Sequence, residues 1–184
     1  MNKSSLLSKA LPHIIAIIYF LVISIFLYRP IIFEGKVMDQ NDINQGKGAA
    51  QEIVDYREAT GEEALWTNSM FGGMPAYLIS VRWSGGQVVQ TAQKLFLLGL
   101  PRPVGENFIA FITFYILLLT FGVRPYLAIA GAMAFGLSTF FIVSIQAGHM
   151  WKIRAMAYMP LVVAGVRLVF AKKYLFGFIL TSLA

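Results

Sequence analysis

Cysteine is absent from this chain of 184 residues. The absence excludes a disulfide framework and any zinc site built on cysteine ligands. Charge is also scarce: 13% of the residues are charged, against about 25% in a typical soluble domain. Hydrophobic residues make up 58% of the chain. So much apolar side chain with so little charge is typical of a membrane protein.

Four long stretches contain almost no charge. Asp, Glu, Lys and Arg are missing from the first three, and Arg167 is the single charged residue of the fourth. Each stretch approaches the roughly 20 residues with which a helix crosses the hydrocarbon core of a bilayer. The stretches are Leu11–Tyr28, Phe108–Val123, Tyr126–Ile145 and Ala155–Ala171. A fifth apolar run, 174–184, is too short to cross. The sequence therefore predicts an all-α integral membrane protein with about four complete transmembrane helices and a truncated fifth.

Acidic residues are missing from both ends of the chain. All nine lie between Glu34 and Glu106, and every charge outside that segment is basic. Lys3 and Lys9 precede the first apolar stretch, which by the positive-inside rule places the N-terminus in the cytoplasm. We therefore expect residues 1–10 to be cytoplasmic and 11–30 to form the first transmembrane helix, an uncleaved signal anchor. Residues 31–106 would then be a large extracytoplasmic loop, and 107–184 would hold the other transmembrane helices.

The loop carries two helical patterns. Gly48–Thr60 has apolar residues on one face and acidic residues on another, which predicts a surface helix. The pattern of Gln87–Leu98 is typical of a helix lying in the membrane interface. Between them, Trp66–Pro75 is rich in aromatic, Met, Gly and Pro residues and predicts an ordered loop packed on the membrane surface.

Small residues recur at one helical spacing in the third apolar stretch. Ala128, Ala132 and Gly136 follow one another every four residues. Such ridges allow helix backbones to approach closely in lipid. We therefore expect this face to pack against a neighbouring helix.

A polar cluster follows the first apolar stretch. Asp39 and Asp42 stand among amide side chains that include Gln45. A carboxylate here could accept a proton from a substrate hydroxyl, or bind a divalent cation through oxygen. The same residues could equally form a solvated turn in which Asn41 or Asp42 caps a helix. Spacing alone leaves both interpretations open.

The loop between the two predicted surface helices offers another kind of contact. The Trp66 ring could stack on a sugar, and Asn68 could form hydrogen bonds with it. Aromatic residues also anchor proteins at the membrane interface, without any ligand.

Three basic residues lie in the turn before the fourth apolar stretch. His149, Lys152 and Arg154 surround Trp151, on the side of the membrane where the positive-inside rule disfavours Lys and Arg. A bound anion, such as a lipid phosphate at headgroup depth, would account for them. Ordinary anchoring to headgroups is the alternative. The net charge of +6 does not indicate a nucleic-acid partner, because the basic residues sit at the ends of predicted helices.

Several of these segments resemble one family. Leu65–Pro75 and Asp42–Gln45 resemble the first outer loop of the YfhO family of bacterial membrane proteins. Gln146–His149, followed by Ala157–Leu161, resembles that family's turn between spans three and four. Family members carry more spans than this chain, so the resemblance implies that the chain is the N-terminal part of a longer protein.

The resemblance implies a multi-span glycosyltransferase of the GT-C class in the bacterial plasma (inner) membrane. Its sugar donor would be carried on a polyprenyl phosphate, and the acceptor would be a cell-envelope polymer or protein on the outer face. In that class a carboxylate of the first outer loop serves as base, and the matching position is Asp42, with Asp39 second. Gln45, Trp66, Asn68, His149, Lys152 and Arg154 are the substrate-binding residues that we expect.

Two other functions remain as alternatives. A non-catalytic scaffold or lipid-binding protein would need only the small-residue helix faces and the outer loop. A transporter usually carries ionisable residues at the bilayer midplane. The first three apolar stretches have none, which counts against a transporter.

Overall fold

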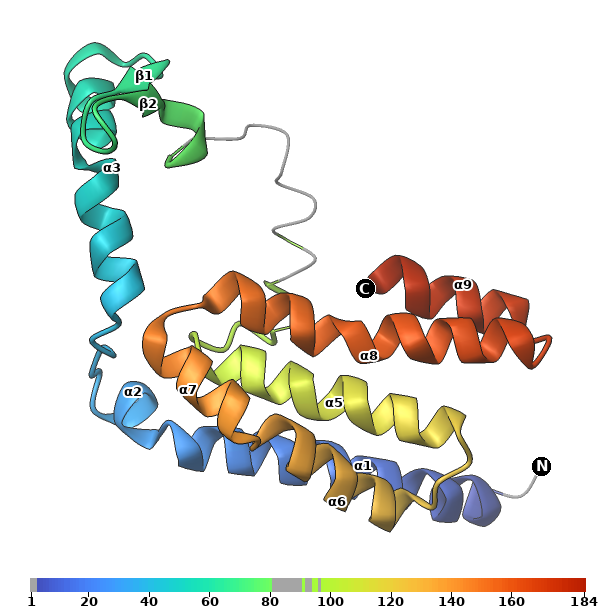
Figure 1. Cartoon of the computed structure of the whole chain (residues 1–184). Helices are drawn as coiled ribbons and strands as arrows, with labels where there is room; N and C mark the ends of the chain where they lie inside the picture. Colours follow the sequence, from blue (N-terminus) through green and yellow to red (C-terminus); the bar gives the residue numbers. More distant parts are fainter. Residues whose placement is uncertain (1–2, 81–90, 92–93, 96) are drawn as a thin grey trace.

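The computed structural model describes residues 3–80, 91, 94–95 and 97–184. It has two parts, a bundle of apolar helices and an arm that leaves one end of the bundle (Figure 1). The elements are α1 (Lys3–Leu27), α2 (Arg29–Phe33), α3 (Asn41–Thr60), β1 (Trp66–Thr67), β2 (Met74–Pro75), the 3-10 helix η1 (Ala76–Leu78), α5 (Val104–Thr120), α6 (Pro125–Gly136), α7 (Thr139–Ala147), α8 (Met150–Phe170) and α9 (Tyr174–Leu183). The chain is thus mostly helical, as predicted, with one hairpin of two short strands.

Two helices of the described residues are long and apolar enough to cross a membrane: Leu7–Leu27 and Met150–Phe170. α6 and α7 would together make a third span, bent by 40° at a short break. We predicted a membrane span over Tyr126–Ile145, and the structure divides this stretch between two helices. The break falls at Leu137 and Ser138, and Ser138 begins α7 with an extended backbone and no side-chain cap hydrogen bond. α5 and α9 are shorter apolar helices.

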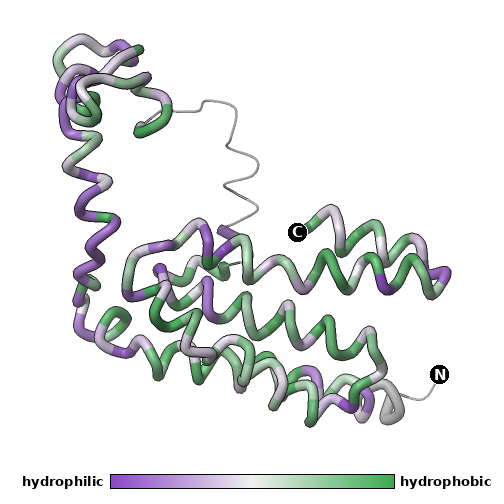
Figure 2. Tube along the Cα trace, in the orientation of Figure 1, coloured by the Kyte–Doolittle hydropathy of each residue, from purple (hydrophilic) through white to green (hydrophobic). Residues whose placement is uncertain are grey.

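The helices of the bundle run side by side and are hydrophobic along most of their length (Figure 2). α5 packs against α1, α6 and α8. The predicted small-residue ridge is confirmed, because Ala128, Ala132 and Gly136 are all buried. A Cβ on Gly136 would collide with the Phe111 ring of α5. Asn107 in α5 also donates a 2.7 Å hydrogen bond to the carbonyl of Gly136, so the two helices approach closely here.

The arm is α3, a mostly hydrophilic helix that runs across the direction of the bundle helices (Figures 1 and 2). The predicted surface helix is confirmed, but it begins at Asn41 and not at Gly48. Asp42 lies in its first turn, where a negative charge stabilises the helix dipole. Asn41 and Asp42 are therefore inside the helix, and Gln40 occupies the cap position without a side-chain bond. α3 ends at Gly61, whose φ of 76° is left-handed.

The hairpin and η1 lie at the far end of α3 (Figure 1). Trp66 pairs with Pro75 and Thr67 with Met74 in antiparallel register. We refer to residues 62–80 as the head of the arm. The second predicted loop helix, Gln87–Leu98, lies mostly outside the described residues.

Candidate functional site

Three connections meet at the end of the bundle from which the arm leaves. They are the segment between α2 and α3, the segment before α5, and the short turn between α7 and α8 (Figure 1). We call this region the arm end. The ionisable residues that the sequence suggested as site residues lie in or directly beside these connections: Asp39, Asp42, His149, Lys152 and Arg154. The geometry of the arm end shows which of them come together.

Asp42 and His149 meet across the junction of arm and bundle. His149 Nδ1 lies 2.7 Å from Asp42 Oδ2. Their side chains are 46% and 44% exposed, so the pair contributes at most about 1 kcal/mol to stability and remains accessible to a substrate. The turn before His149 is close-packed: Gly148 has a φ of +96°, and a Cβ there would lie 3.2 Å from Gln40 Cβ and Ile43 Cγ1.

The other polar residues of the first cluster have different partners. Gln40 donates a hydrogen bond to the carbonyl of Ile145, which ties the start of the arm to α7. Asp39 Oδ1 accepts a 2.6 Å hydrogen bond from Asn44. Gln45 faces Asn41 at 3.4 Å within α3. Asp42 is therefore the carboxylate of this cluster that faces His149.

A buried ion pair lies deeper in the arm end. Glu106, in the first turn of α5, is 1% exposed, and its Oε1 lies 2.8 Å from Arg154 Nη2 in α8. Arg102 Nε approaches the same oxygen at 3.7 Å. Both guanidinium groups stand near the Trp151 ring, with their Cζ atoms 5.1 Å (Arg154) and 5.9 Å (Arg102) from its centroid. A buried carboxylate thus holds two arginines beside one aromatic ring.

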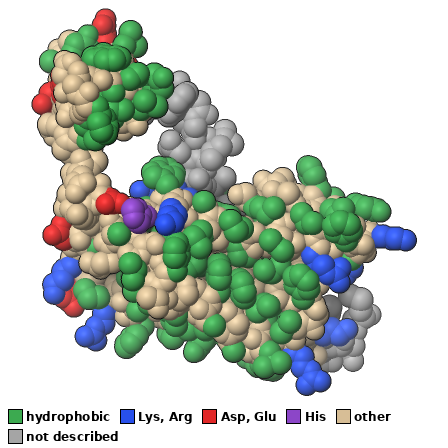
Figure 3. Space-filling view, viewed as in Figure 1, with side chains coloured by type: hydrophobic (Ala, Val, Ile, Leu, Met, Phe, Trp, Pro, Cys, Tyr) green, Lys and Arg blue, Asp and Glu red, His purple; other side chains and the backbone are tan. Residues whose placement is uncertain are grey.

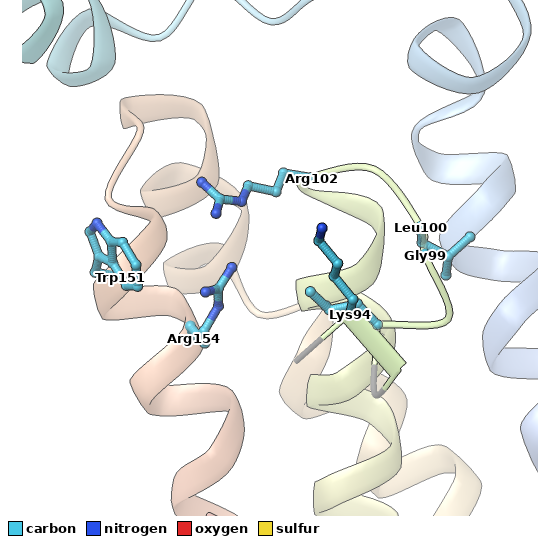
Figure 4. A pocket seen from close by; sticks show the side chains of 7 residues that line it. Lys94, Gly99, Leu100, Arg102, Trp151 and Arg154 are labelled. Carbon is cyan, nitrogen blue, oxygen red and sulfur yellow. The ribbon is translucent and has the colours of Figure 1, made fainter. Parts of the chain in front are cut away.

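The two arginines and Trp151 border a cavity of about 470 Å³, a size typical of small-molecule sites. Its walls are Lys94, Leu97, Gly99, Leu100, Arg102, Trp151 and Arg154. Figure 4 shows Lys94, Arg102, Arg154 and Trp151 around one space. Three cations against the single Glu106 carboxylate leave a surplus of positive charge, and Leu97 and Leu100 supply apolar wall. The cavity therefore suits an anionic group attached to an apolar chain.

The predicted cationic cluster is divided by α8. We expected His149, Lys152 and Arg154 to share one turn, but α8 begins at Met150. Residues two apart on a helix face different directions. Lys152 accordingly turns away from Arg154, and its Nζ lies 4.8 Å from the centroid of the Phe140 ring. Together with His149, Lys152 borders a different cavity of about 520 Å³.

Trp66 and Asn68 are not at the arm end. The backbone N–H of Asn68 donates a 2.8 Å hydrogen bond to Glu52, which lies about 15 Å along α3 from Asp42 at about 1.5 Å per residue. Hydrogen bonds, led by that of the Thr67 hydroxyl, hold the pKa of the Glu52 carboxyl below its usual range. The structure therefore separates the aromatic loop from the carboxylate that it was expected to serve.

Glu106, Arg102 and Lys94 were missed by the sequence reasoning. Glu106 looked like the last acid of the loop, yet it stands two residues before an apolar stretch. A carboxylate that enters a hydrophobic helix needs a cationic partner, and that requirement was the available signal. In the part of the chain that the structure describes, no group of three or more His, Asp or Glu side chains is placed to hold a metal ion.

Comparisons with family models, with curated proteins and with solved structures gave no match for this chain.

Proposed function

We propose that this chain is the N-terminal part of a membrane glycosyltransferase that takes a sugar from a polyprenyl-phosphate carrier. The acceptor is a polymer or protein of the bacterial cell envelope. One observation carries the proposal: a cavity with three cationic side chains and apolar walls lies at the end of an apolar helical bundle. The resemblance to the YfhO family supports the same reading.

In this proposal the arm end faces the outside of the plasma membrane. α1, α5, the bent pair α6–α7 and α8 cross the bilayer, and Lys3 and Lys9 keep the N-terminus in the cytoplasm. Residues 31–106 are then extracytoplasmic. The cavity lies at headgroup depth, where the phosphate of a lipid carrier resides.

The cavity receives the phosphate of the donor. Arg102 and Arg154 donate charged hydrogen bonds to its oxygens, since a guanidinium matches phosphate geometry. The buried Glu106 positions Arg154 through the 2.8 Å contact. Leu97 and Leu100 lie where the first isoprene units emerge. As the sugar leaves, the cationic side chains offset the charge that develops on the departing phosphate.

Asp42 is the general base, and the sugar reaches it from the phosphate cavity, across the start of α8, on the side where His149 lies. The Asp42 carboxylate accepts the proton of the acceptor hydroxyl, whose oxygen attacks the anomeric carbon. The bond from that carbon to the phosphate oxygen breaks, and its electron pair leaves with the polyprenyl phosphate. A single displacement of this kind inverts the anomeric centre. His149 orients the carboxylate through the 2.7 Å contact, and the half-exposed pair leaves room for the acceptor.

Binding of undecaprenyl phosphate to the purified chain tests the cavity. Arg102→Gln should weaken binding by about tenfold or more, because a charged hydrogen bond contributes about 1.5–3 kcal/mol. Arg124→Gln is the matched control, since Arg124 is an exposed arginine at the start of α6. Unchanged binding by Arg102→Gln would remove the cavity from the proposal.

A non-catalytic lipid-binding scaffold is the second candidate. The same cavity favours it, because binding a lipid phosphate there requires no catalysis. The contacts of Gln40 and Asp42, which tie the arm to the bundle, favour it as well. Asp42→Asn in the complete reading frame separates the two functions. If the protein is a transferase, this substitution abolishes sugar transfer but leaves binding of the lipid phosphate intact. If it is a scaffold, the substitution has no sugar transfer to reduce.

A further inference from the structure

The head of the arm exposes large apolar side chains. Leu65 and Phe71 are each 86% exposed. The other large apolar residues that are exposed there are Trp66, Met70, Tyr77 and Leu78. They surround the hairpin at the end of a hydrophilic helix, so nothing in the arm itself buries them. A contiguous apolar patch of this kind marks a contact surface.

The head is firmly attached to α3 by polar contacts. Ser69 donates a 2.8 Å hydrogen bond to the carbonyl of Ala49, and Asn68 N–H donates one of 2.8 Å to Glu52. Arg57, itself buried, pairs with Glu63 at 2.6 Å. Trp66 lies against Gly73, where a Cβ would come within 2.6 Å of the indole nitrogen. The apolar side chains are therefore presented by a fixed scaffold.

The patch and the acidic residues lie on different sides of the head. Figure 3 shows hydrophobic side chains gathered on the side toward which the bundle extends, whereas acidic side chains lie at the left and upper edges of the head. α3 runs across the bundle helices at the arm end (Figure 1). If those helices cross a bilayer, α3 lies along its surface, with the apolar side of the head toward the lipid and the carboxylates toward water.

One aromatic residue of the patch is held in an unfavourable backbone conformation. Phe71 has a φ of 55° and Gly72 a φ of 73°, and Gly73 N–H donates a 2.9 Å hydrogen bond to the carbonyl of Met70. Such a turn favours Asn or Gly at its first central position, since other side chains crowd the backbone there. A bulky side chain that is kept in a strained position suggests a role in binding.

We infer that the head is an interfacial membrane anchor, whose apolar side inserts among the headgroups of the leaflet at the arm end. Trp and Tyr, both present in the patch, are the residues that populate this interface. The exposed apolar surface of the bundle, including Val22 and Phe26 of α1, continues the same lipid contact. Anchored at both ends, α3 stays parallel to the membrane. This inference does not depend on sugar transfer.

The absence of cysteine from the chain makes the test simple. Leu65→Cys places a single fluorophore on the patch, and Glu58→Cys places the matched control on an exposed acidic position of α3. Both variants of the full chain are reconstituted in phosphatidylcholine vesicles that contain a lipid with a headgroup spin label. We expect the Leu65 probe to be quenched several-fold more strongly than the Glu58 probe.

Two outcomes would overturn the inference. Equal quenching of the two probes would mean that the head stands in water. A blue-shifted Leu65 probe that the spin label does not quench would mean that protein, such as a second copy of this chain, covers the patch.

A second variant keeps the test independent of folding. Phe71→Asn combined with Leu78→Gln should reduce quenching of the Leu65 probe at least twofold without lowering the thermal midpoint, because asparagine accepts the backbone of the turn. Undiminished quenching in this variant would contradict insertion of the patch. Neither measurement involves the cavity, so the anchor can fail while the proposed transferase stands.

Discussion

Bundle and arm use different side chains to hold their parts together. In the bundle, helices meet through small residues: Gly136 lies against Phe111, and a Cβ on Gly165 would lie 2.8 Å from the carbonyl oxygen of Gly177. In the arm, the head is attached through polar side chains such as Glu52 and Arg57. The difference follows from the solvent. Lipid is as apolar as a leucine side chain, so helices associate there by close packing, whereas in water polar contacts can close a small unit with few buried apolar residues.

The largest loss of stability should come from breaking the ion pair of the buried arginine in the bundle, Arg154. Breaking the corresponding pair of Arg57 in the arm should cost less. Glu106→Gln removes the carboxylate that faces Arg154, and breaking such a buried pair costs about 3–5 kcal/mol. Glu63→Gln should cost about 1 kcal/mol or less, because Glu63 is 39% exposed and water screens the pair. Thermal unfolding in detergent, followed by circular dichroism, measures both. Equal losses of stability in the two variants would mean that the buried pair and the more exposed pair contribute equally.

Two glycine-to-alanine substitutions, one in the bundle and one in the arm, should change stability less and in opposite directions. Gly136→Ala should destabilise the bundle by about 1–3 kcal/mol, since the new methyl group collides with Phe111. Gly46→Ala should instead stabilise α3 by up to about 1 kcal/mol, because no atom lies within 4 Å of the added Cβ. Chemical denaturation of each variant supplies the comparison. If Gly136→Ala proved neutral, the close approach of α5 and α6 would lose its support.

Acid should loosen the head of the arm. The folded chain lowers the pKa of Glu52 from the usual 4.5, chiefly through the Thr67 hydrogen bond. The carboxylate therefore stabilises the head above pH 4.5, and this contribution is lost as the pH falls through the lower pKa of the folded state. The protection of the Asn68 amide, which is its exchange rate compared with the intrinsic rate at the same pH, should fall over that interval. In Glu52→Gln the Asn68 amide should have low protection at all pH values, and a change of protection with pH that survives in this variant would assign the effect to another group.

Helix content and the packing of the small-residue ridge were predictable from the sequence, as was the polar face of α3. The ridge of Ala128, Ala132 and Gly136 needs only a four-residue period, which the chain displays directly. The break at Ser138 was not predictable in the same way, because apolar residues continue on both sides of it. Mean hydropathy over a whole span does not reveal such a bend.

The candidate site was predictable only in part. Arg154 and Asp42 were suggested by their positions near helix ends, but their partners, Glu106 and His149, lie 48 and 107 residues away in the chain. Lys152 was grouped with Arg154 because the start of α8 was placed too late. Because residues 152 and 154 lie inside α8, their spacing of two places their side chains on different faces of the helix.

By itself the sequence determined an apolar, mostly helical chain and an acidic segment with a hydrophilic helix. Those features depend on the type and period of neighbouring residues, which local geometry converts into faces. Only the tertiary structure decided that Glu106 is buried beneath two arginines, that Asp42 meets His149, and that the aromatic head lies far from both. Such pairings arise when helices distant in sequence pack together, and their free energy depends on burial, which no local pattern encodes.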